Sequence, residues 1–442
     1  MKQAGMRRVA VLGGMRIPFC RSHTAYAELS NLDMLTAALV GLAEKFALQG
    51  AHIDEVVGGA VVTHAKDWNL AREAVIGSPF APTTPGITMM QACGTSLQGA
   101  LGLAAKIATG QIDSGIAMGS DTTSDAPIVF QRKFAQRLVK MSRARSLGQK
   151  LGAFKGMAPG EMAPLPPSTS EPRTGLGMGE HCELMAKEWG ITREAQDLLA
   201  FESHRKAAAA YDEGFMDDLV VPCAGVFRDN NVREDISLEK MAELKPVFDK
   251  VGGTITAANS TPLTDGAATI LLSSEEWAEK CGIPVQAYLT LGRTSAVDYV
   301  HGEGLLMAPT VAVSDLLSQA GLALHDFDYY EVHEAFAAQV LATLKAWESE
   351  VYCRERLGRD APLGAINQSR LNVTGSSIAF GHPFAATGAR ILAVLAKLLH
   401  DRGGQRGLIS VCTAGGMGVA AILEGVEAQT PSKAATEEMG TA

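Results

Sequence analysis

The sequence predicts an α/β protein built around a parallel sheet, and three observations support this prediction. Hydrophobic residues make up 47% and charged residues 20% of the 442 residues, which is typical of a compact globular chain. The 46 glycines indicate many tight turns. Buried apolar runs alternate with helical patterns, as in a sheet covered by helices. A chain of this length suits two or three domains.

The first elements follow the order strand, helix, strand, helix, strand. Apolar runs at residues 8–12 and 54–64 are bounded by turn residues and predict two buried strands. Residues 31–46 predict a helix between them. A second helix begins at Thr95, and residues 114–121 predict a short central strand. This order is typical of a parallel α/β layer.

The pattern changes at residues 131–250, which we predict to be an inserted loop domain. Residues 132–155 carry eight basic side chains and no acidic one, and the proline-rich residues 159–172 follow. The next part is strongly helical, with a break at Gly190 and a helix start at 192–195. The basic run has three interpretations: a solvated face, a contact with the phosphates of a nucleotide, or a docking surface for a partner protein or an acidic membrane.

The C-terminal part repeats a pattern of the N-terminal part. Residues 94–121 and 385–416 share small residues, an apolar helix, a glycine break and a short buried strand. Cys93 directly precedes the first stretch, and His382 lies just before the second. Two similar halves packed face to face would bring both helix starts to one place.

Charge and cysteine content narrow the classes of function. A formal net charge of −9 argues against a nucleic-acid-binding protein. The seven cysteines show no CxxC pair and an odd count, which indicates reduced thiols in a cytoplasmic protein. The N-terminal apolar run is too short for a signal peptide, and no run approaches a membrane span. Residues 429–442 are small and polar and predict a flexible tail.

Cys93 is the first candidate for chemistry. Thr95 and Gln98 have the spacing of a capping box, which predicts that Cys93 lies immediately outside a helix N-terminus. The helix dipole and free amides there lower a thiol pKa from its usual value of about 8.5 and favour a nucleophilic thiolate. The alternative is a buried cysteine that only packs. We accept that alternative for Cys20, Cys182, Cys223, Cys281 and Cys353.

Three further stretches hold candidate residues. His382 lies between a glycine and a proline, which restrict its backbone and suit an aimed imidazole, although a structural histidine in a turn is the alternative. Cys412 ends a buried strand before a Thr-Ala-Gly loop whose amides suit a developing oxyanion. A dinucleotide-binding loop is excluded there because a returning strand follows. His333 and Glu334 lie at the carboxyl end of another strand, and Ala337 excludes an HExxH zinc site.

Together these stretches resemble the thiolase family over residues 9–424. Four motifs, QACGTS, HEAFAAQ, GHPFAATGAR and CTAGGMG, occur in the family's order. His333 stands where many thiolases carry asparagine, and this form, with the long insertion, resembles the thiolase subunits of fatty-acid oxidation multienzyme systems. The resemblance implies a five-layered core of two duplicated αβαβα halves, with the loop domain laid over the active site. The halves would be residues 1–130, completed by about 251–276, and residues 277–428.

The resemblance also implies the roles of individual residues. Cys93 would be the nucleophile that takes up the acyl chain as a thioester, and His382 its base and a member of an oxyanion hole. Cys412 would be the acid/base, and His333 would complete the same oxyanion hole. A second hole would come from the backbone N–H groups of Cys93 and Ala414. The family often has glycine at the position of Ala414.

Coenzyme A contacts are implied at Thr261 and Met178. Gly177 stands where some members carry a histidine, so the resemblance implies that a CoA or acyl contact would be missing there. We interpret Asn259 and Asp265 as structural. The resemblance implies CoA and acyl-CoA as substrates, with no metal and no permanently bound cofactor.

The implied activity is thiolytic cleavage of 3-ketoacyl-CoA. The alternatives are a biosynthetic acetoacetyl-CoA-forming thiolase, a decarboxylating condensing enzyme and a non-catalytic acyl-CoA-binding subunit. Cys412 argues against the condensing enzyme, since those enzymes generally place histidine or asparagine in that role. A homodimer or homotetramer is implied, with a possible hydratase/dehydrogenase partner subunit.

Overall fold

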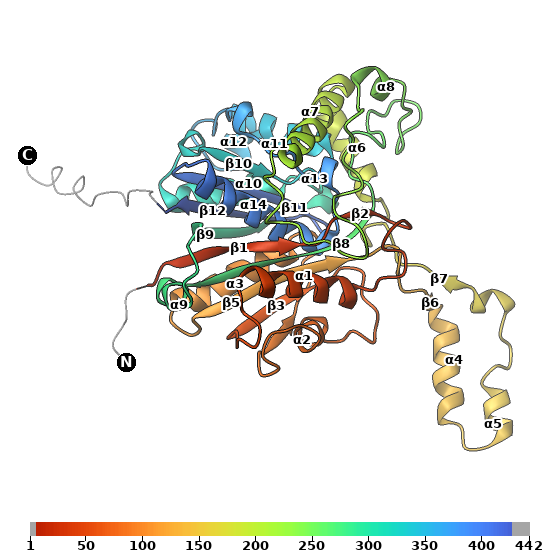
Figure 1. Ribbon diagram of the computed structural model, residues 1–442. Coiled ribbons are helices and arrows are strands. Elements are labelled where there is room, and N and C mark those ends of the chain that lie inside the picture. The colour runs from red at the N-terminus through yellow and green to blue at the C-terminus, as the bar shows by residue number, and fades with distance from the viewer. Residues whose placement is uncertain (1–5, 427–442) are drawn as a thin grey trace, which may run out of the picture.

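A computed structural model of the chain describes residues 6–426 (Figure 1). The predicted flexible tail, residues 429–442, lies outside the described residues. No helix in the described part of the chain is long and apolar enough to cross a membrane.

A mixed sheet forms the N-terminal half. Its strands lie side by side in the order β4 (Gly86–Thr88), β3 (Glu55–Gly59), β5 (Ser114–Asp121), β8 (Thr264–Ser274) and β1 (Val9–Arg16). β3 is parallel to β4 and β5, whereas β8 is antiparallel to both β5 and β1. The three strands of the expected parallel layer, β1, β3 and β5, therefore run in the same direction, although β8 separates β1 from β5 and runs opposite to them. The chain returns from the insertion as β8 and inserts between β5 and β1.

The C-terminal half repeats this pattern. β10 (Tyr329–Val332) is parallel to β11 (Arg406–Thr413), and the antiparallel strands β12 (Met417–Gly425) and β9 (Ala287–Ala296) follow. β12 is antiparallel because only a three-residue turn separates it from β11. The two halves join where β1 pairs with β9, at Ala10–Tyr288 and Val11–Ala287.

Helices complete five layers in the order α, β, α, β, α (Figure 1). The middle layer is α3 (Thr95–Ala108) and α14 (Thr387–Asp401); the outer layers are α1 (Asn31–Lys45) with α2 (Leu70–Ile76), and α10 (Ala308–Ala320) with α11 (Ala337–Glu348). Strand residues alternate between layers: on β1, Val9 and Val11 join the central core while Ala10 and Leu12 face α1. α14 is buried along nearly its whole length, as expected of a middle-layer helix.

The starts of α3 and α14 lie side by side. A Cβ at Gly388 would lie 2.5 Å from the Leu97 backbone nitrogen, so only glycine allows this close approach. The Ser96 hydroxyl accepts a hydrogen bond from the Ala389 amide at 2.8 Å. This packing brings together the loops before the two helices, as the sequence repeat predicted.

The remaining elements lie in the insertion and at the edges. The insertion contains β6 (Val129–Phe130), α4 (Arg132–Arg143), α5 (Leu147–Gly152), β7 (Pro164–Leu165), α6 (Met178–Glu188), α7 (Arg193–Asp212) and α8 (Leu238–Ala242). β2 (Cys20–Arg21), α9 (Glu275–Cys281), α12 (Glu350–Glu355) and α13 (Ser377–Phe380) are short. The predicted break at Gly190 and helix start at Thr192 are confirmed, since Thr192 caps α7 by accepting from the Ala195 amide.

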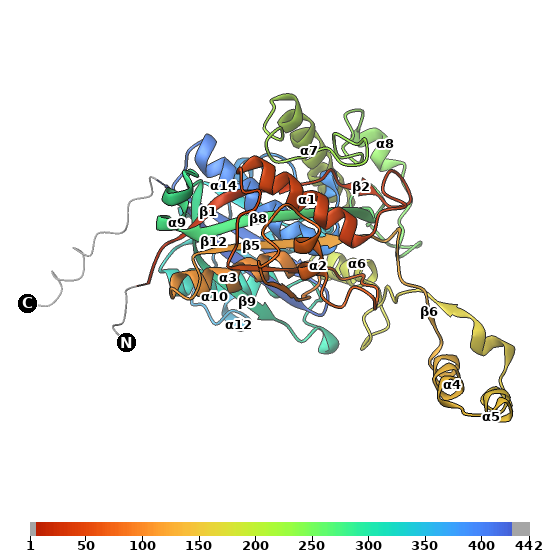
Figure 2. The ribbon, with the colours of Figure 1, turned by 60° about the horizontal axis from the view of Figure 1, so that its bottom comes forward.

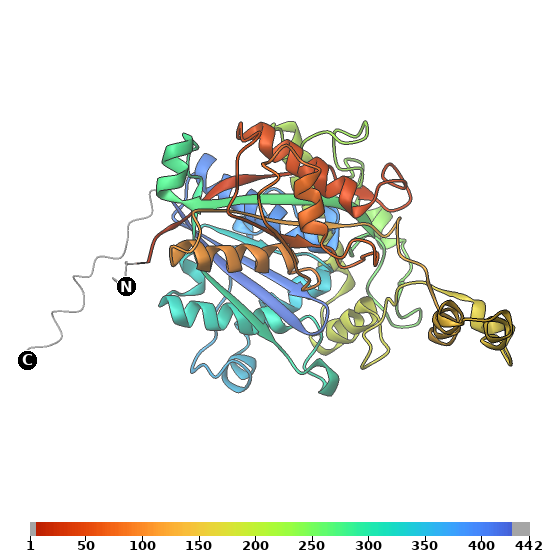
Figure 3. The same ribbon diagram turned by 90° about the horizontal axis from the view of Figure 1, so that it is seen from below.

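The basic run forms a hairpin, residues 129–165, that projects away from the layered body (Figures 1, 2 and 3). The expectation that the insertion as a whole covers the site is therefore wrong for this part. None of the residues of α4 is buried. Arg137 differs from the solvent-exposed basic residues of the hairpin because it makes contacts within it. Its guanidinium pairs with Glu161 at 2.7 Å and donates to the Ala153 carbonyl at 3.0 Å. It holds the hairpin together.

Candidate active site

Cys93 lies in a tight turn immediately before α3. The backbone of Ala92 has a φ of 46°, in the left-handed region that residues other than glycine rarely adopt. The Thr95 hydroxyl closes this turn by donating to the Ala92 carbonyl at 2.7 Å and accepting from the Gln91 amide at 2.8 Å. A strained turn held by neighbouring bonds is common at functional sites.

The predicted capping box is wrong. The N-cap residue of α3 is Gly94, which has no side chain to bond the first helical amides. The Thr95 hydroxyl is not available for capping because it bonds within the preceding turn. The Gln98 side chain instead accepts from the Thr294 hydroxyl at 2.6 Å. The location of Cys93 just before the helix is nevertheless as predicted.

His382 contacts Cys93 directly. Its Nε2 lies 3.1 Å from Cys93 Sγ, and its Nδ1 lies 2.6 Å from the Thr387 hydroxyl at the start of α14. The His382 backbone amide donates to the Thr264 hydroxyl at 2.8 Å. The imidazole is therefore held from both sides, with one nitrogen aimed at the sulfur. This is the geometry of an activated nucleophile.

Burial keeps both partners of this pair neutral. It raises the pKa of the Cys93 thiol to about 12, although amides of Ala414 and of Cys93 itself act in the opposite direction. Burial, with the nearby charge of Arg390, lowers the pKa of His382 to about 3. The expectation of a lowered thiol pKa at Cys93 is wrong, because this helix start lies inside the protein and not in solvent.

The alkylation rate of Cys93 should report this protonation state. Because the raised pKa leaves little thiolate at neutral pH, carboxamidomethylation by iodoacetamide should keep rising up to about pH 10, whereas free cysteine levels off above its pKa of about 8.5. Peptide mass spectrometry after timed quenching measures the rate at Cys93 alone. A plateau below pH 7 would show a preformed thiolate and contradict the neutral pair.

Cys412 and Ala414 reach the same place from β11 and the turn after it. Cys412 is 1% exposed, and burial together with the nearby Cys93 raises its thiol pKa. The Ala414 amide lies close enough to the Cys93 thiol to act against the rise of its pKa. A Cβ at Gly94 would lie 3.0 Å from Cγ2 of Thr413, so the loop of Cys93 packs directly on this strand. The structure thus brings the two thiols and His382 together.

His333 completes the cluster. Its ring lies 4.2 Å from that of His382, centroid to centroid, and its Nδ1 lies 2.8 Å from the Ser377 hydroxyl. Its Nε2 is buried and has no hydrogen-bond partner among the described residues. Burial lowers its pKa, so the ring is neutral. Donor atoms of Cys93, His333 and His382 all lie within 4.8 Å of one another.

The two predicted CoA-binding residues lie beside this cluster. The Thr261 hydroxyl and amide both donate to the Ala335 carbonyl, at 3.2 and 3.1 Å, and Ala335 follows Glu334 in the HEAF motif. Met178 begins α6 and packs on the buried group that includes Cys412. Their contact with CoA stays a prediction.

Asn259 and Asp265 have the structural contacts we expected. The Asn259 side chain accepts from the Thr256 amide at 2.8 Å and donates to Asp197 at 2.8 Å. The Asp265 carboxylate accepts from the Thr123 amide at 2.9 Å. Both side chains tie loops together.

Sequence reasoning missed Ser377, Arg390, Thr264 and Thr387. Thr387 and Arg390 lie within or beside the GHPFAATGAR motif, and Ser377 five positions before His382, so proximity in sequence was the only signal. Their contacts with His333 and His382 depend on how separate strands and loops meet.

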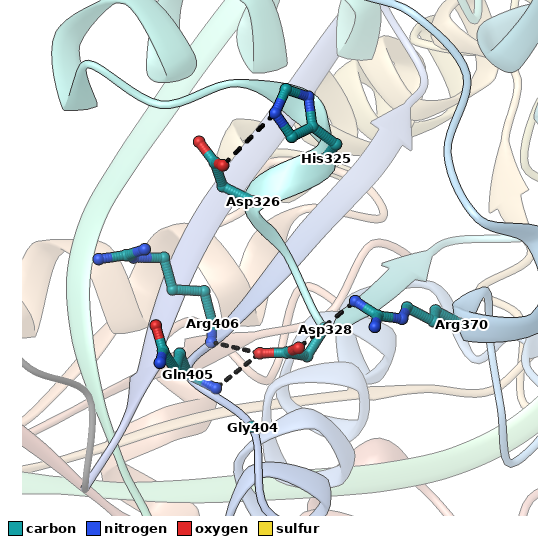
Figure 4. A pocket seen from close by; sticks show the side chains of 7 residues that line it. All are labelled: His325, Asp326, Asp328, Arg370, Gly404, Gln405 and Arg406. Atoms are coloured by element: carbon teal, nitrogen blue, oxygen red, sulfur yellow. Dashed lines mark hydrogen bonds and ion pairs between the residues drawn. The ribbon is translucent and has the colours of Figure 1, made fainter.

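A cavity of about 440 Å³ lies elsewhere, at the amino ends of β10 and β11 (Figure 4). Its lining residues are His325, Asp326, Asp328, Arg370, Gly404, Gln405 and Arg406. The Asp328 carboxylate accepts from the Gln405 amide at 2.6 Å and pairs with Arg370. The lining includes none of the predicted catalytic residues.

Comparison with known proteins places the chain in a known family. The thiolase N-terminal domain family matches residues 9–276, and the thiolase C-terminal domain family matches residues 285–425. The chain therefore belongs to the thiolase family.

Individual relatives agree with this assignment. A 3-ketoacyl-CoA thiolase of Shewanella sp. (strain W3-18-1) is 42% identical over 423 residues, 94% of this chain and 97% of the relative; one of Yersinia pestis (strain Pestoides F) is 41% identical over the same shares. The crystal structure of the Bacillus anthracis acetyl-CoA acetyltransferase has a TM-score of 0.79 at 28% identity, and human mitochondrial 3-ketoacyl-CoA thiolase 0.78 at 26%. Each match covers 96% of this chain and 100% of the other.

Proposed function

We propose that this protein is a 3-ketoacyl-CoA thiolase that cleaves 3-ketoacyl-CoA with CoA to give acetyl-CoA and an acyl-CoA two carbons shorter, in fatty-acid β-oxidation. The single observation that carries the proposal is the 3.1 Å contact between His382 Nε2 and Cys93 Sγ, beside a second buried thiol. Relatives named 3-ketoacyl-CoA thiolase at about 42% identity support the substrate class.

In the first half-reaction, Cys93 transfers its proton to His382 and its sulfur attacks the keto carbon. The oxyanion forms near His333 and His382. When the C2–C3 bond breaks, the acyl chain stays on Cys93 as a thioester and the electron pair leaves with acetyl-CoA as a carbanion. Cys412 protonates that carbanion. Covalent catalysis divides one difficult cleavage into two easier steps.

In the second half-reaction, the Cys412 thiolate takes the proton of the incoming CoA thiol. The CoA sulfur attacks the thioester, whose oxyanion is stabilised by the amides of Cys93 and Ala414. Collapse of that intermediate releases the shortened acyl-CoA and the Cys93 sulfur, which regains its proton from His382. Every proton is returned and the reaction has no net oxidation or reduction, so this cycle requires no redox cofactor.

The biosynthetic direction uses the same residues in reverse. The structural likeness to an acetyl-CoA acetyltransferase, with a TM-score of 0.79, favours acetoacetyl-CoA formation as the second candidate. Degradation is preferred because the relatives that align over 94% of this chain are named 3-ketoacyl-CoA thiolase.

The direct test supplies 3-ketoacyl-CoA substrates of several chain lengths with CoA and measures acetyl-CoA and the shortened product. Without added CoA, intact mass and peptide mapping should find the acyl group on Cys93. Absence of product at every chain length, in folded protein, would refute the proposal.

We further propose a homodimer or homotetramer in the cytoplasm, with a hydratase/dehydrogenase subunit as the partner at the basic hairpin. The hairpin supports this because it projects from the body and exposes Lys133, Lys140 and Arg143. The free thiols of all seven cysteines support the reducing compartment.

Replacing Lys133, Lys140 and Arg143 by glutamine should change turnover of a short soluble substrate by less than about two-fold, since charges on a projecting hairpin are screened from the site by solvent. Steady-state thiolysis measures this. Arg137 stays untouched because it pairs with Glu161 inside the hairpin. A collapse of turnover would instead assign the basic run to CoA binding.

A further inference from the structure

Ser377 links His333 to a buried arginine. The Ser377 hydroxyl lies 2.8 Å from His333 Nδ1, and it accepts a hydrogen bond from Arg390 Nη2 at 2.6 Å. Ser377 and His333 are 0% exposed, and Arg390 is 2% exposed. The three side chains come from separate elements: α13, the end of β10 and α14.

The direction of these bonds follows from their chemistry. A guanidinium group only donates, so the Ser377 oxygen must be the acceptor from Arg390. The hydroxyl proton then has one acceptor within reach among the described residues, His333 Nδ1. If Nδ1 carried the proton instead, the buried hydroxyl would have no acceptor, which is rare in folded proteins. His333 Nδ1 is therefore the acceptor, and the proton of this neutral ring resides on Nε2.

His333 Nε2 is the nitrogen that faces the reacting groups. It is buried and has no hydrogen-bond partner among the described residues, and a ring nitrogen of His333 lies within 4.8 Å of donor atoms of Cys93 and His382. An N–H there is a ready donor to an oxyanion, whereas a lone pair there would repel it. His382 needs the opposite tautomer, because its Nε2 must accept the thiol proton while Nδ1–H donates to Thr387.

We propose that Ser377 and Arg390 are positioning residues that hold His333 in the Nε2–H tautomer, so that two adjacent imidazoles are fixed in opposite proton states, one to accept and one to donate. The inference rests on the proposed function for its kinetic consequence. The tautomer itself does not depend on it.

A kinetic test uses Ser377→Ala with Ser376→Ala as its matched control. Ser376 is also buried and also accepts from Arg390, at 3.3 Å, but its hydroxyl makes no contact with His333. Ser377→Ala should lower kcat for thiolysis by about 10-fold to 100-fold and leave KM for CoA unchanged. This loss is smaller than the ~100-fold to 1,000-fold caused by removing an oxyanion donor altogether. Ser376→Ala should change kcat by less than about three-fold. Equal losses in the two variants would overturn the proposal.

A double substitution separates positioning from support of the fold. The amide of His333→Asn carries its own N–H donor and has no tautomer to fix. In that background Ser377→Ala should cost less than about three-fold, so the two effects are strongly non-additive. The same loss in both backgrounds would assign Ser377 a merely structural role.

Nitrogen-15 NMR of the histidine-labelled wild-type protein reads the tautomer directly, with the His333 signals assigned by their loss in His333→Asn. Nε2 should appear as the protonated nitrogen and Nδ1 as the bare one. The reverse assignment refutes the inference even in an active enzyme. An inactive protein with the expected signals would refute the proposed function and leave the tautomer standing.

Discussion

Replacing Cys93 with serine should lower kcat/KM for thiolysis by at least ~1,000-fold, a loss of ~4 kcal/mol of transition-state stabilisation. A serine hydroxyl is far less acidic than a thiol, and the neutral His382 is too weak a base to ionise it in this buried site. Coupled measurement of acetyl-CoA formation checks the loss. The substituted protein should also show no stable acyl adduct by intact mass.

Cys353→Ser is the matched control for this loss. Cys353 is buried like Cys93, and its thiol only donates to the carbonyls of Trp347 and Ala346, at 3.4 and 3.5 Å, which a serine hydroxyl can also do. It should retain activity within about three-fold. Retained activity in Cys93→Ser would instead favour a non-catalytic acyl-CoA-binding subunit that has kept the fold.

The convergence of Cys93, His382 and Cys412 could be predicted because each lies in a compact motif. The internal repeat also predicted that the starts of two helices meet. They can meet because Gly388 has no side chain at the point where α14 approaches α3. The protonation state could not be predicted in this way. A helix start lowers a thiol pKa only where the dipole outweighs desolvation, and the depth of Cys93 is set by β11 and α14, which lie about 300 residues further along the chain.

Three other features could not be predicted because they depend on how distant parts of the chain meet. The antiparallel position of β8 depends on the chain returning after the insertion, which local pattern does not encode. The composition of residues 132–155 predicted a charged surface. It did not predict that this segment projects from the body or that Arg137 forms an ion pair within the hairpin. The link from Arg390 through Ser377 to His333 needs three elements to meet, so no spacing along the chain reveals it.

Cys412→Ser should separate the two chemical roles of the site. This substitution leaves the Cys93 sulfur and the His382 imidazole in place, and the CoA thiolate can leave without a proton from Cys412, so a thioester should still form from acyl-CoA. Proton transfer at the α-carbon of acetyl-CoA should fall by about 100-fold to 10,000-fold, the usual contribution of a positioned acid/base. The raised pKa of the Cys412 thiol already makes ionisation difficult, and a hydroxyl makes it harder still.

Deuterium uptake into the methyl group of acetyl-CoA in heavy water, followed by proton NMR, measures this exchange without needing net turnover. Intact mass of the same sample supplies the acylation control. Exchange at the wild-type rate, with Cys93 acylated, would remove Cys412 from the role of acid/base and require another group near the sulfur of Cys93. Loss of both signals in a folded variant would mean that the two thiols act as one unit, because each would then be needed for the same first step.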